Sequence, residues 1–387
     1  MKKIFMYPIS ERFHIPTSTF PAGSVHNSFV NIRRLGIVMA ALTQFIPEMA
    51  STMPPQDNVI SIDSYNIDVN NICNITLVNP TCNSFPRNVI AIGGKILYVT
   101  TFENYACGQY SMPCIVIPGS VVNLGEGCLS CRFELKFVAF EFMPTLETIC
   151  DHAFFGCLQL SQIFIPSSVT HLGRECFFSC SRLSSVVFEE GSQLRSIGSK
   201  AFSNCKSLKN ITIPNCVTTL FQECFLRCHN LCSVRFNAES LLELIESSCF
   251  CECKKLHTVE LEKCSNLMKI GENAFNMNLS LIKILIPGRV KWVGRYCFNL
   301  CQNLQTLTFA IDSCLASVGA GTFDSCISLL FISFPKSLQY LEFDCFAMCK
   351  NLNCIVFAPG CVLREGSRVL EIYSAITINP PIVLDHA

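Results

Sequence analysis

The stretch "SQIFIPSSVTHLGRECFFSCSRL", residues 161–183, is one complete copy of a repeat, and its apolar pattern predicts the fold. Ile163 and Ile165 alternate with Gln162 and Phe164, which is the period-two pattern of a strand with one buried face. A second short extended piece follows at 169–173, and residues 174–180 are expected to form one or two helical or 3₁₀ turns. The other core positions of this copy are Val169, Leu172, Phe177, Cys180 and Leu183.

The phenylalanine of this copy recurs at intervals of 23 or 25 residues. A fixed period of about 20 to 29 residues is typical of a leucine-rich-repeat solenoid. We therefore expect an α/β-type solenoid, right-handed and curved into a horseshoe or arc, with parallel strands on the concave face and short strands and helical turns on the convex face. The recurring residues are Phe154, Phe177, Phe202, Phe225, Phe250, Phe275, Phe298, Phe323 and Phe346.

The two repeat lengths have a local explanation. Long copies have loops such as "EEGSQL" at 189–194 after the strand, whereas short copies turn through Ile-Pro. Proline fixes φ and has no N–H group, so it should end the strand and stop the ladder of hydrogen bonds there. The prolines of the short copies are Pro118, Pro166, Pro214, Pro287 and Pro335.

Composition excludes some classes of protein. The 387 residues are 50% hydrophobic, and 29 basic residues balance 29 acidic ones without a basic stripe in any window, which argues against a nucleic-acid partner. Nothing reaches the roughly 18 consecutive apolar residues of a transmembrane span. Residues 1–12 and residues 33–51 each resemble a secretion signal only in part. The apolar run within residues 1–12 is too short for such a signal.

Cysteine is the compositional outlier, with 27 residues. At the first cysteine position of the motif the copies carry cysteine, alanine or threonine, so this position requires small size. At the second position eight copies carry cysteine and one carries asparagine, and we expect a structural ladder in which the thiol or amide bonds to a carbonyl at the turn into the next copy. The ladder residues are Cys157, Cys180, Cys205, Cys228, Cys253, Asn278, Cys301, Cys326 and Cys349.

Two other uses of the thiols stay open. The stretch "CFCEC", residues 249–253, has the look of a metal site, although only Cys251 lies outside the repeat positions. Disulfides are better placed at cysteines outside the repeat register, which cluster before and at the start of the array; these candidates are Cys73, Cys82, Cys107, Cys114, Cys128, Cys131 and Cys150. The prediction is that the protein has no metal and no cofactor.

Motifs for catalysis are missing. The seven histidines form no His-x-x-x-His pair and have no nearby group of carboxylates, and there is no phosphate-binding glycine loop or G-x-S-x-G turn. The sequence therefore predicts a non-enzymatic protein. The outward strand positions become the candidate binding site, since solenoids commonly bind on their extended face. The candidates are Gln162, Phe164, Asn210, Thr212, Arg235, Glu260, Lys283, Thr306 and Thr308.

The consensus behind "CLQLSQIFIPSSVTHLGRECFFSC", residues 157–180, closely resembles the BspA-like, or Treponema-type, leucine-rich-repeat family over about residues 114–358. Members of that family are surface proteins of bacteria and of mucosal protist parasites, and the cysteines and alternating spacing resemble the protist branch. The resemblance implies an adhesin or surface antigen that binds a host matrix or cell-surface protein. Many members have a C-terminal membrane span, which this sequence lacks.

The domain prediction follows from the repeat. Residues 1–85 are expected to form an N-terminal segment of uncertain order, 86–113 a degenerate cap with strands in "NVIAIG" and "ILYVTT", 114–358 the repeat array, and 359–387 the C-terminal cap. The resemblance implies a cell-surface or secreted location. The alternative is a cytoplasmic scaffold for protein–protein interaction, because no clear signal peptide or anchor is present. The sequence does not indicate an oligomeric state.

Overall fold

The computed structural model describes residues 75–77, 89–92, 95–102, 114–117, 119, 121–140, 144–364, 377–379 and 384–385. The chain divides into two units, Met1–Asn58 and Val59–Ala387, and every described residue belongs to the second. The two partial secretion signals, most of the predicted N-terminal segment, and Cys73, Cys82 and Cys107 lie outside the described residues. The predicted domain limits stay predictions.

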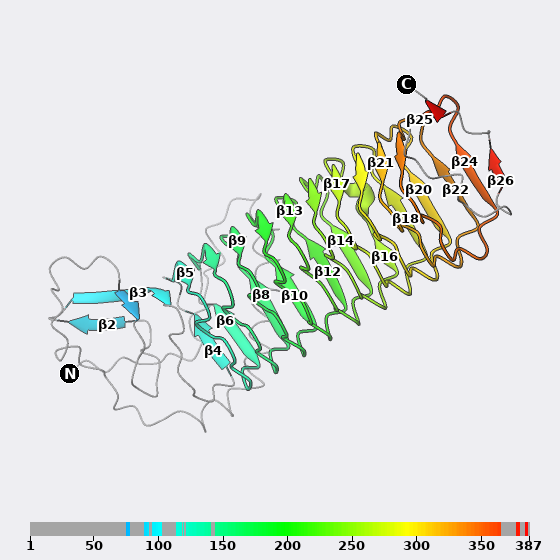
Figure 1. Ribbon diagram of the computed structural model, residues 1–387. Coiled ribbons are helices and arrows are strands. Elements are labelled where there is room, and N and C mark those ends of the chain that lie inside the picture. The colour runs from blue at the N-terminus through cyan, green and yellow to red at the C-terminus, as the bar shows by residue number, and fades with distance from the viewer. Residues whose placement is uncertain are drawn as a thin grey trace, which may run out of the picture. The chain divides into compact units, whose positions relative to one another are not determined.

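The array alternates one longer and one shorter strand in each repeat, so two rows of strands follow one another from β4 to β25 (Figure 1). Long strands such as β8 (Gln162–Ile165) bury every second side chain: Ile163 and Ile165 are buried, and Gln162 and Phe164 alternate with them, as the sequence pattern predicts. The long strands are β4 (Cys114–Ile117), β6 (Phe137–Phe140), β8 (Gln162–Ile165), β10 (Ser185–Phe188), β12 (Asn210–Ile213), β14 (Ser233–Phe236), β16 (Thr258–Val259, shortened), β18 (Lys283–Ile286), β20 (Thr306–Phe309), β22 (Phe331–Phe334) and β24 (Cys354–Phe357).

The short strands form a continuous parallel sheet, which runs in chain order from β1 (Ile75–Leu77) and β3 (Lys95–Phe102) to the last full repeat. Strand β2 (Val89–Ile92) pairs antiparallel with β3, so both strands expected in the N-terminal cap are present. The remaining members are β5 (Asn123–Leu124), β7 (Thr148–Ile149), β9 (His171–Leu172), β11 (Ser196–Ile197), β13 (Thr219–Leu220), β15 (Leu244–Ile245), β17 (Lys269–Ile270), β19 (Trp292–Val293), β21 (Ser317–Val318) and β23 (Tyr340–Leu341).

At the C-terminal end the two rows continue into the residues predicted to form a cap. Strand β26 (Thr377–Asn379) pairs parallel with β24. Strand β27 (Leu384–Asp385) pairs parallel with β25 (Leu363–Arg364). Each row of strands is therefore extended by one further strand beyond the last repeat.

The long strands, in contrast, form separate small sheets, and proline sets the breaks. In copies without proline, the residue after the strand donates its N–H to the preceding copy, as Glu189 does to the Ile165 carbonyl at 3.0 Å. Pro166 and Pro214 occupy the same place and have no N–H, so β8 does not pair with β6, nor β12 with β10. Proline therefore ends the ladder as predicted, but only toward the preceding copy.

The turn after each short strand is not helical, and this part of the prediction was wrong. Residues 174–179 form consecutive hydrogen-bonded turns, and two of them, Glu175 and Ser179, have φ of 53° and 57°. Left-handed backbone costs a non-glycine residue roughly 1–2 kcal/mol. In return, the N–H groups of Glu175, Phe177 and Ser179 all donate to carbonyls of the next copy at 2.8–2.9 Å, so the turn itself becomes part of the stacking interface.

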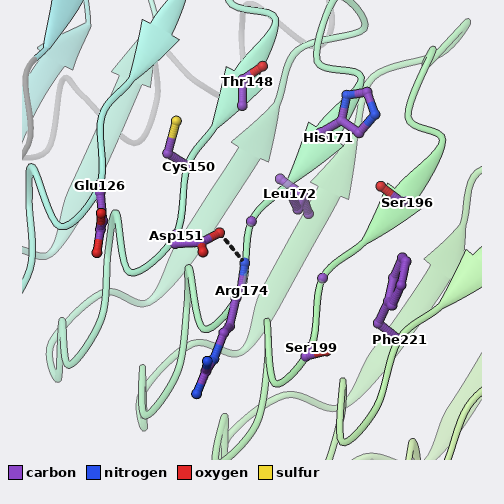
Figure 2. A pocket seen from close by; sticks show the side chains of 12 residues that line it. Glu126, Thr148, Cys150, Asp151, His171, Leu172, Arg174, Ser196, Ser199 and Phe221 are labelled. Carbon is purple, nitrogen blue, oxygen red and sulfur yellow. Dashed lines mark hydrogen bonds between the residues drawn. The ribbon is translucent and has the colours of Figure 1, made fainter.

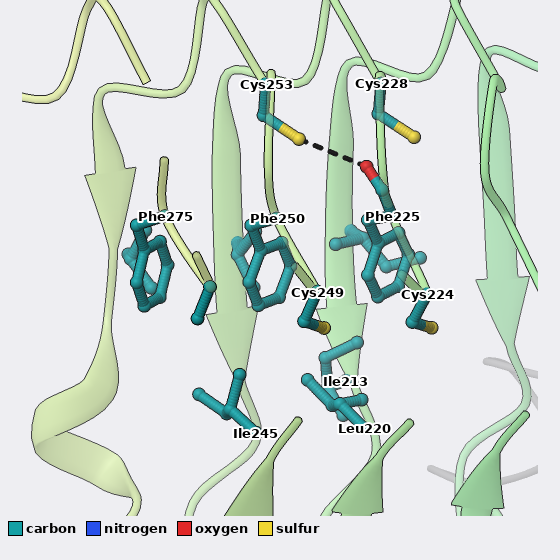
Figure 3. Packing of buried hydrophobic residues seen from close by; sticks show 14 of the residues in the cluster. Ile213, Leu220, Cys224, Phe225, Cys228, Ile245, Cys249, Phe250, Cys253 and Phe275 are labelled. Atoms are coloured by element: carbon teal, nitrogen blue, oxygen red, sulfur yellow. Dashed lines mark hydrogen bonds between the residues drawn. The ribbon is translucent and has the colours of Figure 1, made fainter. Parts of the chain in front are cut away.

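The core is a column of phenylalanines flanked by aliphatic side chains. All apolar positions predicted from residues 161–183 are buried, and Phe177 lies between Phe154 and Phe202 with ring centroids 5.1 and 5.2 Å away. Figure 3 shows the same stack at Phe225, Phe250 and Phe275. Offset stacking of this kind adds about 0.5–1.5 kcal/mol per pair to the gain from burial. The column therefore joins neighbouring copies energetically.

The cysteine ladder exists, and each thiol donates to a backbone carbonyl. Cys253 bonds to the Phe225 carbonyl, the contact drawn in Figure 3, and the eight ladder bonds span 2.9–3.2 Å from sulfur to oxygen. The acceptor lies in the preceding copy, whereas the sequence suggested the turn into the next copy. The first cysteine position is buried in every copy, which agrees with its requirement for small residues.

Asn278 does not replace the ladder bond, contrary to the prediction. Its side chain is fully buried, yet neither Oδ1 nor Nδ2 has a hydrogen-bond partner. The amide is longer than a thiol at the same backbone position, so its donor is not in the place of a cysteine sulfur. A buried polar group without a partner costs about 1–3 kcal/mol. Asn278 is therefore a weak point between two intact stretches of ladder.

We predict that Asn278→Cys stabilises the protein by about 1–2 kcal/mol, because it removes two unpartnered buried atoms and completes the ladder toward the Phe250 carbonyl. Urea unfolding followed by circular dichroism measures the effect as a higher midpoint. Cys253→Asn is the matched control and should lower the midpoint. An unchanged midpoint for Asn278→Cys would show that the asparagine is already satisfied.

Candidate functional site

The outward side chains of the long strands form one surface, which we call the long-strand face. Of the nine predicted site residues, Phe164, Glu260 and Thr306 are half-buried and the other six are exposed. The strand register places Thr212 beside Arg235 and Lys283 beside Thr306. Asn210 accepts a hydrogen bond from the hydroxyl of Ser233 at 2.7 Å through Oδ1. The candidates therefore lie along the row of long strands, and their role in binding stays a prediction.

A group of charges lies at the centre of this face. The Glu260 carboxylate is 3.4 Å from Nε of Arg235 and 2.7 Å from Nζ of Lys263. Strand β16 ends at Val259, and residues Leu261–Lys263 form a 3₁₀ helix, η3, so Glu260 is not a strand residue as expected. That helix brings Lys263 to the face. Lys283 makes no ion pair in the part of the chain that the structure describes.

Sequence reasoning missed Lys263 because it extended the strand pattern of the other copies through 258–261. The available signal was Glu260 followed by Lys263 three residues later, a spacing at which side chains meet on a helical turn. Apolar side chains flank the charged group on the same face. Val187, Leu285 and Phe331 expose 47%, 36% and 53% of their surface.

A shallow groove lies at the other side of the array, beside β7, β9 and β11 (Figure 2). The Asp151 carboxylate in it accepts the backbone N–H of Arg174 at 2.7 Å. Gly173 is needed there, because a β-carbon would lie 2.5 Å from the backbone of the preceding copy. Burial, together with Asp151 and Glu126, raises the pKa of the Cys150 thiol. The Asp151 carboxylate in the groove is therefore used in packing one copy against the next, and the Cys150 thiol is a poor nucleophile.

Stacking also places His152 between two carboxylates, which the sequence analysis did not expect. Its Nδ1 is 3.7 Å from Glu126 and its Nε2 is 3.5 Å from Glu175. The three residues come from successive copies, so their proximity cannot be seen in a linear search for motifs. The imidazole lies on the turn surface, 29% exposed, and its Nδ1 has no hydrogen-bond partner among the described residues.

The buried thiols of the ladder are chemically quiet. Burial raises the pKa of Cys301 and Cys349 to about 12, so these ladder residues stay protonated and act as donors. Two of the disulfide candidates, Cys131 and Cys150, are free thiols. Among the described residues no group of three or more histidine, cysteine, aspartate or glutamate side chains is arranged to hold a metal ion. Burial raises the pKa of Cys251 to about 11.

The fold and the face define a class of protein, the leucine-rich-repeat solenoids with an open strand surface. More particularly, the chain belongs to the family described as BspA type leucine rich repeat region, whose model matches residues 100–232 and 234–353 in six copies. Membership of this family supports a role as a protein-interaction or surface repeat module. Members of the family are known as non-enzymatic repeat proteins, and the family resembles cell-surface proteins. No helix among the described residues has the length and apolar character that a bilayer crossing requires.

Several solved structures are similar to the chain. A leucine-rich cell surface protein of Faecalibacterium prausnitzii is 22% identical with a TM-score of 0.45, over 81% of this chain and 88% of that one. A leucine-rich repeat protein of Bacteroides ovatus is 18% identical with a TM-score of 0.45, over 79% and 91%. The pneumococcal vaccine antigen PcpA is 20% identical with a TM-score of 0.37, over 78% and 88%. No curated protein matches the chain.

We predict that the ladder thiols do not react in the folded protein. With the pKa of Cys301 and Cys349 near 12, almost no thiolate exists at pH 8, and both sulfurs are buried. The exposed Cys131 and Cys314 should react with a maleimide within minutes. Mass spectrometry of the labelled peptides measures this, and labelling in urea is the control. Rapid native labelling of Cys301 would contradict a closed ladder.

Proposed function

We propose that the protein is a non-enzymatic recognition module that binds a host or cell-surface protein through the long-strand face. The observation that carries the proposal is the combination on that face of a charged centre, Arg235, Glu260 and Lys263, with exposed apolar side chains on either side of it. Family membership supports an interaction role, and the similarity to surface proteins supports a location outside the cell.

The composition of the face fits a protein ligand better than a small molecule. Protein interfaces combine a few apolar or aromatic anchors with charges that set orientation. Phe331 and Leu285 provide anchors on β22 and β18, and Lys283 provides an unpaired cation on the same strand as Leu285. The predicted contact residues Gln162, Asn210, Thr212 and Thr308 add exposed polar groups along the surface.

The charge arrangement also favours a partner with an acidic site. The exposed ion pair of Arg235 and Glu260 contributes only about 0–1 kcal/mol to stability, so the scaffold does not require it. Glu260 is shared between two cations, Arg235 and Lys263, and Lys283 lies on a strand of the following copy. The face therefore has a surplus of positive charge at its centre.

The second candidate is an intracellular scaffold that binds a protein through the same face. It is favoured by the ladder itself, since each of its eight cysteines must be a reduced thiol to donate its bond. Reduced thiols are typical of the cytosol, whereas exported chains usually pair theirs. Burial protects the ladder in either compartment, so the location of the protein in the cell decides between the two candidates.

We expect Arg235→Glu combined with Lys283→Glu to weaken partner binding by about 10- to 100-fold, which is about 1.4–2.7 kcal/mol, since the reversed charges repel an acidic site on the partner. Binding of the labelled protein to intact host cells and to immobilised extracellular-matrix proteins measures the loss. Lys336→Glu with Lys350→Glu changes the net charge equally, uses exposed lysines outside the candidate site, and should bind as the unmodified protein does. Equal binding by both double variants would exclude the long-strand face.

The surface location is tested separately with an antibody against the array on unpermeabilised cells of the source organism. Labelling of intact cells is expected for an adhesin or surface antigen. Labelling only after permeabilisation, with an intracellular protein as the control for leakage, would replace the adhesin proposal with the intracellular scaffold. This experiment does not depend on knowing the binding partner.

A further inference from the structure

A second charged surface lies at the edge of the array, between the ladder cysteines and the long strands. Lys206 and Lys254 each directly follow a ladder cysteine, Lys255 comes next in its copy, and Lys209 directly precedes β12. All four are exposed. We call these four residues the lysine strip. The four lysines do not form a local sequence motif, because two copies contribute them and a third copy lies between those two.

Stacking places the strip on one surface. The ladder bonds fix Cys205, Cys228 and Cys253 at equivalent positions of three successive copies. The Asn230 side chain donates to the carbonyl of Lys206 at 2.7 Å, which ties two of these copies together at the edge. Parallel strands are about 4.8 Å apart. Lys206 and Lys254 are therefore about 10 Å apart along the array, with His229 of the middle copy between them.

The strip is not neutralised by carboxylates. None of its four lysines makes an ion pair within the described residues, although Lys200, Lys263 and other cations there do. Glu252, two residues before Lys254, has its carboxylate 2.9 Å from Nε of Arg227 and 4.0 Å from Nε2 of His229. Burial and then Lys254 lower the pKa of His229, the carboxylate of Glu252 opposes this, and Lys206 and Arg227 lower the pKa by smaller amounts. The positive charge of the strip therefore comes from its lysines, and two of them, Lys254 and Lys206, lower the pKa of His229 in the middle copy.

We propose that the lysine strip binds a linear sulfated polysaccharide lying along the array. A linear polyanion lying along the array meets the lysines of two copies about 10 Å apart, and lysine ammonium groups bind such a chain as point charges with little demand for geometry. The strip contains no aromatic side chain on which nucleic-acid bases would stack. It also contains no large apolar side chain of the kind that anchors a protein partner. This surface is separate from the central charges of the long-strand face.

The test uses immobilised heparin as the sulfated polysaccharide. We expect the full chain to bind it at low salt, and the triple variant Lys206→Gln, Lys254→Gln and Lys255→Gln to bind at least tenfold more weakly. Each lysine that contacts the polyanion releases counterions, so the dependence of log Kd on log salt should also become shallower by about two. Both quantities are measured by surface plasmon resonance between 50 and 200 mM salt, roughly the range over which such contacts are lost.

Two further variants make the result specific. Lys291→Gln, Lys336→Gln and Lys350→Gln remove the same charge from three exposed lysines outside the strip, and heparin binding should be unchanged. Arginine at the three strip positions keeps the charge and should retain binding, which excludes a folding defect as the cause. Equal losses in both glutamine triples, or no binding by the unmodified protein, would overturn the proposal. Stronger strip-dependent binding to a single-stranded oligonucleotide or to anionic vesicles would replace the polysaccharide with that partner.

Discussion

Each copy of the repeat is stacked directly on the equivalent residues of its neighbours, and the rest of the structure depends on this constraint. A phenylalanine must pack against a phenylalanine about 5 Å away, and a ladder thiol must find a carbonyl of the preceding copy. A substitution is therefore felt by two neighbours at once. The same constraint explains why a single copy does not fold alone, since most of its hydrogen bonds and apolar contacts lie across an interface.

Stacking also explains the cysteines without any chemistry at sulfur. The ladder position is fully buried and faces a peptide carbonyl, so it requires a side chain that is small, mostly apolar and able to donate one weak hydrogen bond. Alanine lacks the donor, and asparagine is too long, as the unpartnered amide of Asn278 shows. Threonine meets a similar need at the first cysteine position, where Thr322 donates to two carbonyls.

The parts of the fold that depend on periodicity could be predicted from the sequence. The long strands, the buried phenylalanines and the ladder all follow from comparing copies within one chain. The left-handed turns could not be predicted, because Glu175, Ser179 and their equivalents vary in type and share only a backbone conformation. The 3₁₀ helix at Leu261–Lys263 is a departure of one copy from the pattern, so extending the pattern misplaced Glu260 and hid Lys263.

Charges show most clearly which surface positions stacking alone does not explain. Like charges at equivalent positions of adjacent copies repel, and a surface selected only for stability places opposite charges there. The turn columns follow this rule, with Lys200 beside Glu223 and Arg227 beside Glu252. The lysine strip departs from it, since two copies contribute its four lysines, with His229 of the middle copy between them, and none of the four makes an ion pair among the described residues. Because the scaffold gains nothing from that arrangement, the reason for it lies in what the surface contacts.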